Sequence, residues 1–279
     1  MKTKRNYLLR MISCIIFFPT IWFLYGCQQV VSIDLNTANP RVVVEGNIKD
    51  QPGPYTVVLS MTGSYFDTTL ATPSISHAQV VITDNLGNCD TLKESISGTY
   101  QSSRLLGVSG RTYTLSVNAD GKEYMATSSM PTKVFIDSLY VLPRHEFGGE
   151  SGYDIYVTFK DPPELGNYYR INARSSAVIP ADSIDGRRYR LFTDKLTNGN
   201  EMTERIRAGR NVNIGDTITI ELCSIDKASY DYFHTLSDIL SSDRSPTSLS
   251  PANPNSNISG DALGYFAAYT IDSKKIIIP

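Results

Sequence analysis

The sequence predicts a mainly β protein, with an N-terminal immunoglobulin-like antiparallel β-sandwich and a second β-rich domain that carries one α-helix. Three observations predict this fold class. Residues 41–131 are short segments of β-forming residues separated by turn residues, and residues 132–279 continue with longer strand patterns. Only residues 227–241 repeat apolar side chains at helical spacing. The 279 residues, 41% hydrophobic and 19% charged, suit a globular protein of one or two domains.

Seven strands are expected in the sandwich. Gln51-Pro52-Gly53-Pro54 is a turn cluster that no helix would tolerate, and Asp120-Gly121 is typical of a two-residue hairpin turn. The strand candidates are Arg41–Lys49, Tyr55–Met61, Ala78–Asp84, Cys89–Ser95, Gly98–Tyr100, Thr112–Ala119 and Lys122–Ser128. Seven short strands in fewer than 100 residues, with no helix between them, favour an immunoglobulin-like sandwich.

The second domain is expected to span residues 132–279. Its strand candidates are Phe135–Leu142, Tyr153–Lys160, Tyr168–Ser175, Arg188–Phe192, Thr217–Ser224, Gly264–Ile271 and Lys275–Ile278. The helix is predicted over Lys227–Ser241, with Asp226 as its N-cap. Asp243–Gly260, which is rich in Ser, Pro and Asn, is predicted to be a surface loop.

The first 26 residues have the order of a secretory signal peptide. Four basic residues lie in the first ten positions, an apolar run covers residues 11–25, and Gly26-Cys27 follows. The run of 15 residues contains Pro19 and is shorter than the ~20 that a spanning helix needs. Because residues 24–27 resemble a bacterial lipobox, we expect residues 1–26 to be removed, Cys27 to be acylated, and residues 27–40 to form a tether. An ordinary signal peptide and a transmembrane anchor are the alternatives.

The charge of the mature chain bears on its partners. Removal of the signal peptide takes four of the 26 basic residues and none of the 28 acidic ones, which leaves a formal net charge of −6. A mildly acidic body offers no broad positive surface to a phosphate backbone, so no nucleic-acid partner is expected.

The sequence contains no recognisable catalytic motif, and we expect neither an enzyme nor a cofactor. His77, His145 and His234 each lack a second ligand-type residue at metal-binding spacing, so no metal site is predicted. Asp84–Asp90 holds several oxygen donors, but its place between two strand patterns favours a hairpin turn over a calcium loop.

Of the four cysteines, Cys14 would be removed with the signal peptide and Cys27 would be acylated, which leaves Cys89 and Cys223. Their spacing matches no redox, zinc or haem motif. Each lies in or beside a strand pattern, so buried free thiols are the preferred interpretation, with a disulfide as the alternative in an oxidising compartment.

The candidate binding residues are aromatic and lie in the second domain. The chain has 17 tyrosines, and its one tryptophan lies in the signal peptide. We expect the exposed members of Tyr168, Tyr169, Arg170, Tyr230 and Tyr232 to bind a ligand or partner, because tyrosine and arginine are enriched at interfaces. Strand alternation should turn only one of Tyr168 and Tyr169 outward.

Three stretches together resemble one family. They are residues 41–46 followed by 50–55, residues 110–115, and residues 256–258 with 264–266. In these stretches the chain resembles the Bacteroidota lipoproteins called domain of unknown function 4249, over about Cys27 to Pro279. The resemblance implies an outer-membrane lipoprotein, often encoded near TonB-dependent receptors. It supplies no activity or catalytic residue to transfer.

The function expected from these observations is that of a non-enzymatic accessory protein at the outer membrane. It would be held there by its N-terminal lipid and would bind a peptide, a glycan or a TonB-dependent receptor. One alternative is a structural or assembly lipoprotein of the envelope with no small ligand. The other is a hydrolase with a dispersed pair of carboxylates.

Overall fold

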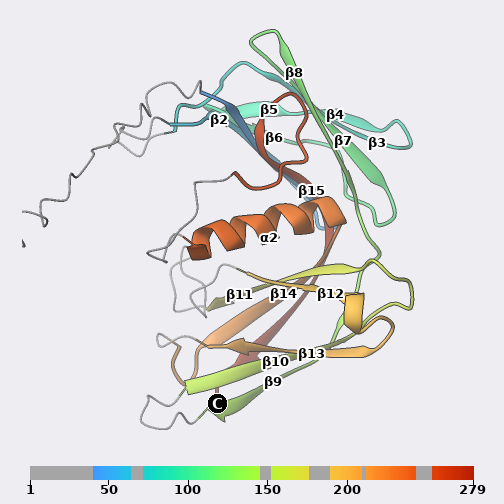
Figure 1. Cartoon of the computed structure of the whole chain (residues 1–279), viewed down its shortest axis with the longest axis vertical. Coiled ribbons are helices and arrows are strands. Elements are labelled where there is room, and N and C mark those ends of the chain that lie inside the picture. Colours follow the sequence, from blue (N-terminus) through green and yellow to red (C-terminus); the bar gives the residue numbers. More distant parts are fainter. Residues whose placement is uncertain (1–39, 64–71, 145–151, 176–188, 209–211, 243–252) are drawn as a thin grey trace, which may run out of the picture. The chain divides into compact units, whose positions relative to one another are not determined.

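A computed structural model describes residues 40–63, 72–144, 152–175, 189–208, 212–242 and 253–279 (Figure 1). The fold is mainly β, as predicted. Residues 40–279 form one compact unit. The predicted signal peptide, Cys27, most of the tether and His145 lie outside the described residues.

The N-terminal half is an immunoglobulin-like sandwich of two antiparallel layers. Its strands are β1 (Val42–Lys49), β2 (Thr56–Met61), β3 (Gln79–Asp84), β4 (Cys89–Thr91), β5 (Lys93–Ile96), β6 (Thr99–Gln101), β7 (Thr112–Ala119) and β8 (Lys122–Ser129). One layer has the order β1-β2-β6-β5 and the other β4-β3-β7-β8. Lettered along the chain, these are the A-B-E-D and C′-C-F-G layers of the immunoglobulin arrangement.

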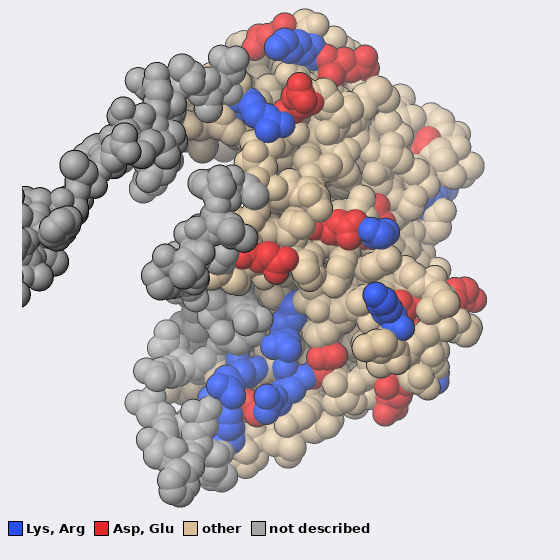
Figure 2. All heavy atoms as spheres, viewed as in Figure 1, with Lys and Arg blue, Asp and Glu red and all other residues tan. Residues whose placement is uncertain are grey.

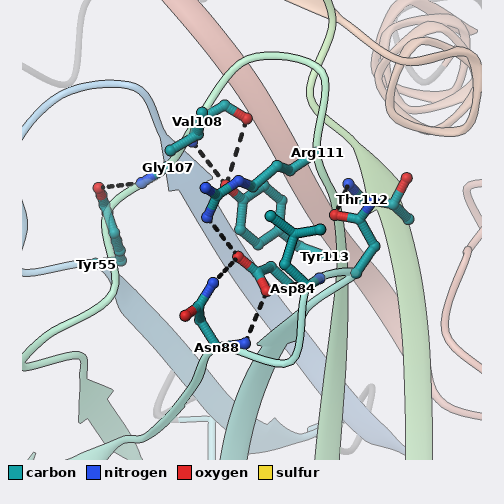
Figure 3. Close-up of polar contacts among 10 residues, drawn as sticks. Tyr55, Asp84, Asn88, Gly107, Val108, Arg111, Thr112 and Tyr113 are labelled. Carbon is teal, nitrogen blue, oxygen red and sulfur yellow. Dashed lines mark hydrogen bonds and ion pairs between the residues drawn. The ribbon is translucent and has the colours of Figure 1, made fainter.

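Alternating side chains from both layers fill the sandwich core. Val44, Val57, Ile82, Leu115 and Val117 are each no more than 1% exposed, as expected for strands with one buried face. At the edge of this core the Val108 N–H donates a hydrogen bond to the hydroxyl of Tyr113 at 2.6 Å (Figure 3). A tyrosine at the start of strand F, here β7, that bonds back to the preceding loop is the tyrosine corner of immunoglobulin-like domains.

The predicted strand Cys89–Ser95 is two strands rather than one. β4 pairs with β3 in one layer and β5 pairs with β6 in the other, so the chain changes layer at Leu92. The Leu92 side chain is buried, and its N–H donates to the Val80 carbonyl at 2.9 Å. The sandwich therefore has eight strands instead of the seven predicted.

The cysteine prediction is correct for one residue and wrong for the other. Both Cys89 and Cys223 are free thiols, and Cys223 is buried as expected. Cys89 is exposed, because in the three-residue strand β4 only the central residue, Asp90, faces the core.

The segment Asp84–Asp90 is a hairpin turn, as predicted. The Asp84 carboxylate accepts hydrogen bonds from the N–H groups of Leu86 and Asn88, the Asn88 side chain and the Arg111 guanidinium, at 2.6 to 3.0 Å (Figure 3). Burial by itself would raise the pKa of Asp84, but these hydrogen bonds together lower it. The carboxylate thus joins the hairpin turn to the residue that precedes β7, two positions before the corner tyrosine.

The C-terminal half has three layers. Its elements are β9 (Ile136–Arg144), β10 (Gly152–Lys160), β11 (Tyr168–Ser175), β12 (Arg190–Thr193), the 3₁₀ helix η2 (Asp194–Leu196), β13 (Glu201–Arg207), β14 (Thr217–Ile225), α2 (Lys227–Ser242) and β15 (Leu263–Ile277). Figure 1 shows α2 on one side of β11 and β14, with the sheet β13-β10-β9 on the other. The predicted helix and its N-cap are confirmed, because Asp226 Oδ1 accepts the Ser229 N–H at 2.9 Å. Strand β13 was not predicted.

Strand β15 belongs to both halves, and this differs from the predicted division after residue 131. Residues 263–269 pair in parallel with β1, and residues 270–277 pair antiparallel with β14. Phe266 and Ala268 lie in the sandwich core, whereas Ile276 packs against the second core. The two C-terminal strand candidates are thus one continuous strand, and it joins the two halves in a sheet of eight strands.

The junction of β15 with β1 requires a glycine. Gly264 lies opposite Val44, has a φ of 95°, and a Cβ placed on it would lie 2.0 Å from the Val44 carbonyl oxygen. A side chain there would meet both the unfavourable φ and a backbone clash that no rotamer change can relieve.

We predict that Gly264→Ala lowers the free energy of unfolding by at least about 3 kcal/mol, because strain and clash add. Gly87→Ala is the matched control, since Gly87 has a φ of 86° but an added Cβ there meets nothing within 4 Å. The control should lose only about 1 kcal/mol. Urea denaturation measures both values, and equal losses would contradict the clash.

Candidate functional site

The predicted binding residues lie in and around the interface between α2 and the large sheet. Tyr168, Tyr169 and Arg170 are consecutive on β11, and Tyr230 and Tyr232 lie on the first two turns of α2. β11 alternates as predicted, with Tyr169 facing the second core and Tyr168 facing the helix. The structure therefore separates the five residues into a surface pair and three packing residues.

The surface pair consists of Tyr168 and Tyr230. Their ring centroids are 5.0 Å apart and the rings are tilted by 45°. Both side chains are half-buried, and the Tyr230 ring also lies 5.6 Å from the imidazole of His234, which is one turn further along α2. Because the strand and the helix are held in regular backbone structure, the two rings present a preformed aromatic surface.

Tyr169 is a core residue rather than a surface residue. It is 1% exposed and lies edge-on to Phe159 at 5.1 Å. Its hydroxyl donates a hydrogen bond to the buried carboxylate of Asp161, which also accepts the Gly199 N–H at 2.8 Å. Burial, followed by the bond to Asp161, raises the pKa of Tyr169.

Tyr232 also belongs to the core, which corrects its inclusion among the binding residues. It is 7% exposed and packs against Tyr265 at 4.7 Å and Phe233 at 5.4 Å between ring centroids. Burial raises the pKa of its hydroxyl. Its neighbour Phe233 is buried as well, so these two rings form the contact of α2 with β15.

Arg170 holds the helix on the sheet. Its guanidinium carbon lies 4.5 Å from the ring centroid of Phe233 on α2 and 5.1 Å from that of Tyr269 on β15. Burial by itself would lower the pKa of Arg170, but the neighbouring Cys223 thiol and Tyr269 hydroxyl raise it. Arg170 thus acts as a cation between two aromatic faces, a contact of about 2 kcal/mol or more when it is removed from water.

A pocket of about 250 Å³ opens beside Tyr168. Its walls come from three places: the end of β8 and the segment after it, the start of β11, and the junction of β14 with α2. The lining residues are Ser129, Pro131, Thr132, Val134, Gly166, Asn167, Tyr168, Tyr169, Ser224, Ile225, Asp226 and Lys227. The pocket therefore combines aromatic surface with hydroxyl, amide, carboxylate and ammonium groups.

Asp226 fixes the geometry of this pocket. One of its oxygens caps α2, and the other accepts the Ser128 hydroxyl at 2.7 Å and the Ser129 N–H at 3.1 Å. The start of the helix is therefore attached to the last strand of the sandwich. The sequence identified Asp226 as an N-cap but carried no signal for its contact with β8, which is about 100 residues away along the chain.

The other predicted features are placed as follows. His77 is exposed beside Glu94, with Nδ1 3.8 Å from Oε2, and His234 lies 3.0 Å from an Asp238 oxygen on the surface of α2. Among the described residues there is no group of three or more His, Cys, Asp or Glu side chains that could hold a metal ion. In the same part of the chain, no helix is long and apolar enough to cross a bilayer.

The fold and the site define a two-core β protein whose halves share one sheet and whose aromatic pocket lies at their junction. The chain belongs to the family described as domain of unknown function (DUF4249), whose profile matches residues 28–275. No curated protein matches the chain significantly. Among solved structures, a two-domain fibronectin type III segment of chicken tenascin matches 68% of this chain and 92% of its own length, at 14% identity and a TM-score of 0.22. A structural similarity with so low a TM-score supports no conclusion about this chain.

We predict that removing the two adjacent hydroxyls of β11 affects the free energy of unfolding to very different extents. Tyr169→Phe should lower the free energy of unfolding by about 1.5 to 3 kcal/mol, because it leaves Oδ1 of the buried Asp161 carboxylate without its hydroxyl donor while Oδ2 keeps the Gly199 N–H. Tyr168→Phe should change it by less than about 0.5 kcal/mol, as for most surface substitutions. Urea denaturation at pH 7 compares them, and a loss in Tyr168→Phe as large as that in Tyr169→Phe would contradict the assignment of faces.

Proposed function

We propose that the chain is a non-enzymatic, lipid-anchored binding protein of the Bacteroidota outer membrane that assists TonB-dependent nutrient uptake. The proposed location rests on the lipobox-like residues 24–27 and on the resemblance of the sequence to this family, which implies an outer-membrane lipoprotein. The binding role rests on the geometry beside α2.

The observation that carries the binding role is the Tyr168–Tyr230 ring pair, of which Tyr168 lines the pocket. Two amphipathic rings fixed 5.0 Å apart supply apolar contact area, and little side-chain entropy remains to be lost on binding. The neighbouring Asn167 and Lys227 add a donor-rich rim. Surfaces of this composition recur at the centres of interfaces.

The size of the pocket limits its occupant. At about 250 Å³ it is smaller than the ~300 to 1,000 Å³ of pockets for drug-sized ligands. It suits one sugar ring or one side chain of a larger partner. A glycan end or a loop of a transporter barrel would each fit this description.

The lipid anchor is tested by Cys27→Ser in the full precursor. The variant should lose incorporation of radiolabelled fatty acid and should leave the outer-membrane fraction, because the acylated cysteine is the proposed attachment. Cys89→Ser is the matched control and should keep both the label and the location. Equal labelling of Cys27→Ser and the native chain would contradict the proposal.

Binding is tested by partner capture from detergent-extracted membranes. Tyr168→Ala and Tyr230→Ala should each weaken capture of a TonB-dependent barrel by about fivefold or more, equivalent to about 1 kcal/mol, without lowering the melting temperature. Leu86→Ala, at a leucine 68% exposed on the sandwich, should have no effect.

Three results would count against the proposal. Capture that survives the double variant would remove the tyrosine pair from the binding surface. Capture of envelope proteins other than a TonB-dependent barrel would favour the structural or assembly role. Turnover of a glycan by the purified chain would favour the hydrolase.

A further inference from the structure

Asp226 lines the pocket beside Tyr168 and has no cation as its partner. The donors to its carboxylate are the hydroxyl of Ser128 and the N–H groups of Ser129 and Ser229. All of these donors are neutral, and Asp226 forms no ion pair with a described residue. The pocket therefore has one negative charge in its wall that no positive charge of the chain offsets.

Two further carboxylates lie directly behind the pocket wall. Asp194 Oδ2 accepts the N–H groups of Gly166 and Asn167 at 2.8 and 3.0 Å, and both of these residues line the pocket. Asp161 Oδ1 accepts the hydroxyl of Tyr169, another lining residue. The two aspartates are 2% and 1% exposed, and neither forms an ion pair with a described residue.

Buried carboxylates without a cation leave a negative potential at this pocket. A charge buried in a protein is normally paired, because the interior withdraws the water that would stabilise it and strengthens its field. Tyr169 shows this field. Its pKa is raised chiefly by burial, then by the bond to Asp161, and further by the charges of Asp161 and Asp194. The pocket therefore favours a positively charged occupant.

The lysines at the margin of the pocket are already balanced. Lys227 lines the pocket, but its ammonium is paired with Asp231 one turn along α2 and is 67% exposed. Figure 2 shows acidic and basic side chains next to each other over the start of α2, as expected for this pair. Lys133 is paired with Asp50 at 2.8 Å. Neither pair adds a net charge beside the pocket.

Two other lysines are sequence neighbours of the buried aspartates. Lys160 precedes Asp161 and Lys195 follows Asp194. Both lysines are exposed, and neither forms an ion pair with a described carboxylate. Water and salt screen such surface charges far more than they screen a buried carboxylate, so these lysines offset the negative potential only in part.

A buried hydroxyl without a partner belongs to the same pocket. Ser224 lines the pocket and is 3% exposed, and its Oγ has no hydrogen-bond partner among the described residues. Ser224 is the register partner of Tyr169 on β11, so both side chains lie on the same face of the sheet. Buried polar groups in native folds are normally hydrogen-bonded, which points to a donor supplied by water or by a ligand.

The three aspartates do not form a metal site. In the part of the chain that the structure describes, no group of three or more His, Cys, Asp or Glu side chains could hold a metal ion. Their charges instead add over the pocket, which suits an organic cation. The Tyr168 ring contributes an aromatic surface, to which ammonium and guanidinium groups are attracted.

We infer that the pocket takes a lysine or arginine side chain of a protein partner. In this proposal, which rests on the proposed function of the same site, the cation lies between the Tyr168 ring and the aspartates. Its N–H groups donate to Asp226 and Ser224, and the stem of the side chain fills the rest of the 250 Å³. A neutral sugar would gain no attraction from the aspartates.

The test uses the acylated chain in detergent and three peptides, GSGKGSG, GSGQGSG and GSGEGSG, which differ only in the charge of the central residue. Saturation-transfer NMR measures their binding without a label. The lysine peptide should bind at least about tenfold more tightly than the glutamine peptide, and the glutamate peptide should bind most weakly. The lysine side-chain protons should receive more saturation than the glycine and serine protons.

Asp194→Asn removes one of the charges and preserves the wall. An asparagine oxygen in the place of Oδ2 keeps both N–H donors, because Oδ1 has only a contact of 3.5 Å with the Thr193 hydroxyl. The variant should reduce the preference for the lysine peptide over the glutamine peptide at least about threefold. Glu123→Gln removes the same charge from an exposed position on β8 and should leave the preference unchanged.

The lysine or arginine ligand is overturned by equal binding of the lysine and glutamine peptides, or by no binding of the lysine peptide up to about 10 mM. These two results need no variant. An unchanged preference in Asp194→Asn also overturns it. Displacement of the lysine peptide by the neutral trisaccharide maltotriose would make a sugar the occupant and would overturn it as well.

The proposed function can fail separately from this ligand. Capture of the barrel that survives Tyr168→Ala and Tyr230→Ala would remove the tyrosine pair from the binding surface, whatever the peptides do. Capture that is lost in both variants, together with equal binding of the lysine and glutamine peptides, would retain the binding site and overturn only the cationic ligand.

Discussion

The backbone pairing of β15 is the constraint on which the rest of the structure depends. This strand is in parallel register with β1 over residues 263–269 and in antiparallel register with β14 over residues 270–277. Parallel neighbours require a long connection, and here the chain between β1 and β15 comprises β2 to β14 and α2. The close approach of the Val44 carbonyl to Gly264 sets the position at which the two halves meet.

The candidate site follows from this shared sheet. Tyr265 and Tyr269 of β15 reach the same face as Arg170 of β11, so the sheet offers aromatic surface and one cation to the helix. Phe233 of α2 covers that cation, and Asp226 attaches the start of the helix to β8. Because Phe233 and Asp226 both fix α2 on the sheet, the Tyr230 side chain on this helix lies against that of Tyr168.

The sequence pattern within a segment was sufficient to predict the elements that depend mainly on that segment, such as β11 and α2. β11 was predicted at its observed bounds, because period-two alternation and β-branched or aromatic residues are properties of the segment itself. The helix and its cap were predicted for the same reason. Strand β13 was missed because its inward residue Glu204 is acidic, which hides the alternation of Met202 and Ile206. Burial raises the pKa of Glu204. The sequence alone gives no indication that this glutamate is packed in the fold.

Tertiary contacts determine what the sequence did not predict. The sequence required one of Tyr168 and Tyr169 to face inward, but only the position of the second core decides which. Tyr232 has the composition of an interface residue and is buried because Tyr265, 33 positions later, lies beneath it. β15 was divided into two segments because Asp272, Ser273 and Lys274 interrupt its apolar pattern. Ser273 and Lys274 are exposed because β1 no longer pairs with β15 at that point.

One shared strand, β15, should make the two halves a single cooperative unit. Native-state hydrogen exchange at increasing denaturant measures this most directly, by following the amides of Val44 in β1 and Leu222 in β14, each buried in a different core. Both amides should report the same free energy of opening and the same dependence on denaturant, because the strand couples the two cores. Opening of Val44 at a distinctly lower free energy, with Leu222 still protected, would show two independent domains and would contradict it.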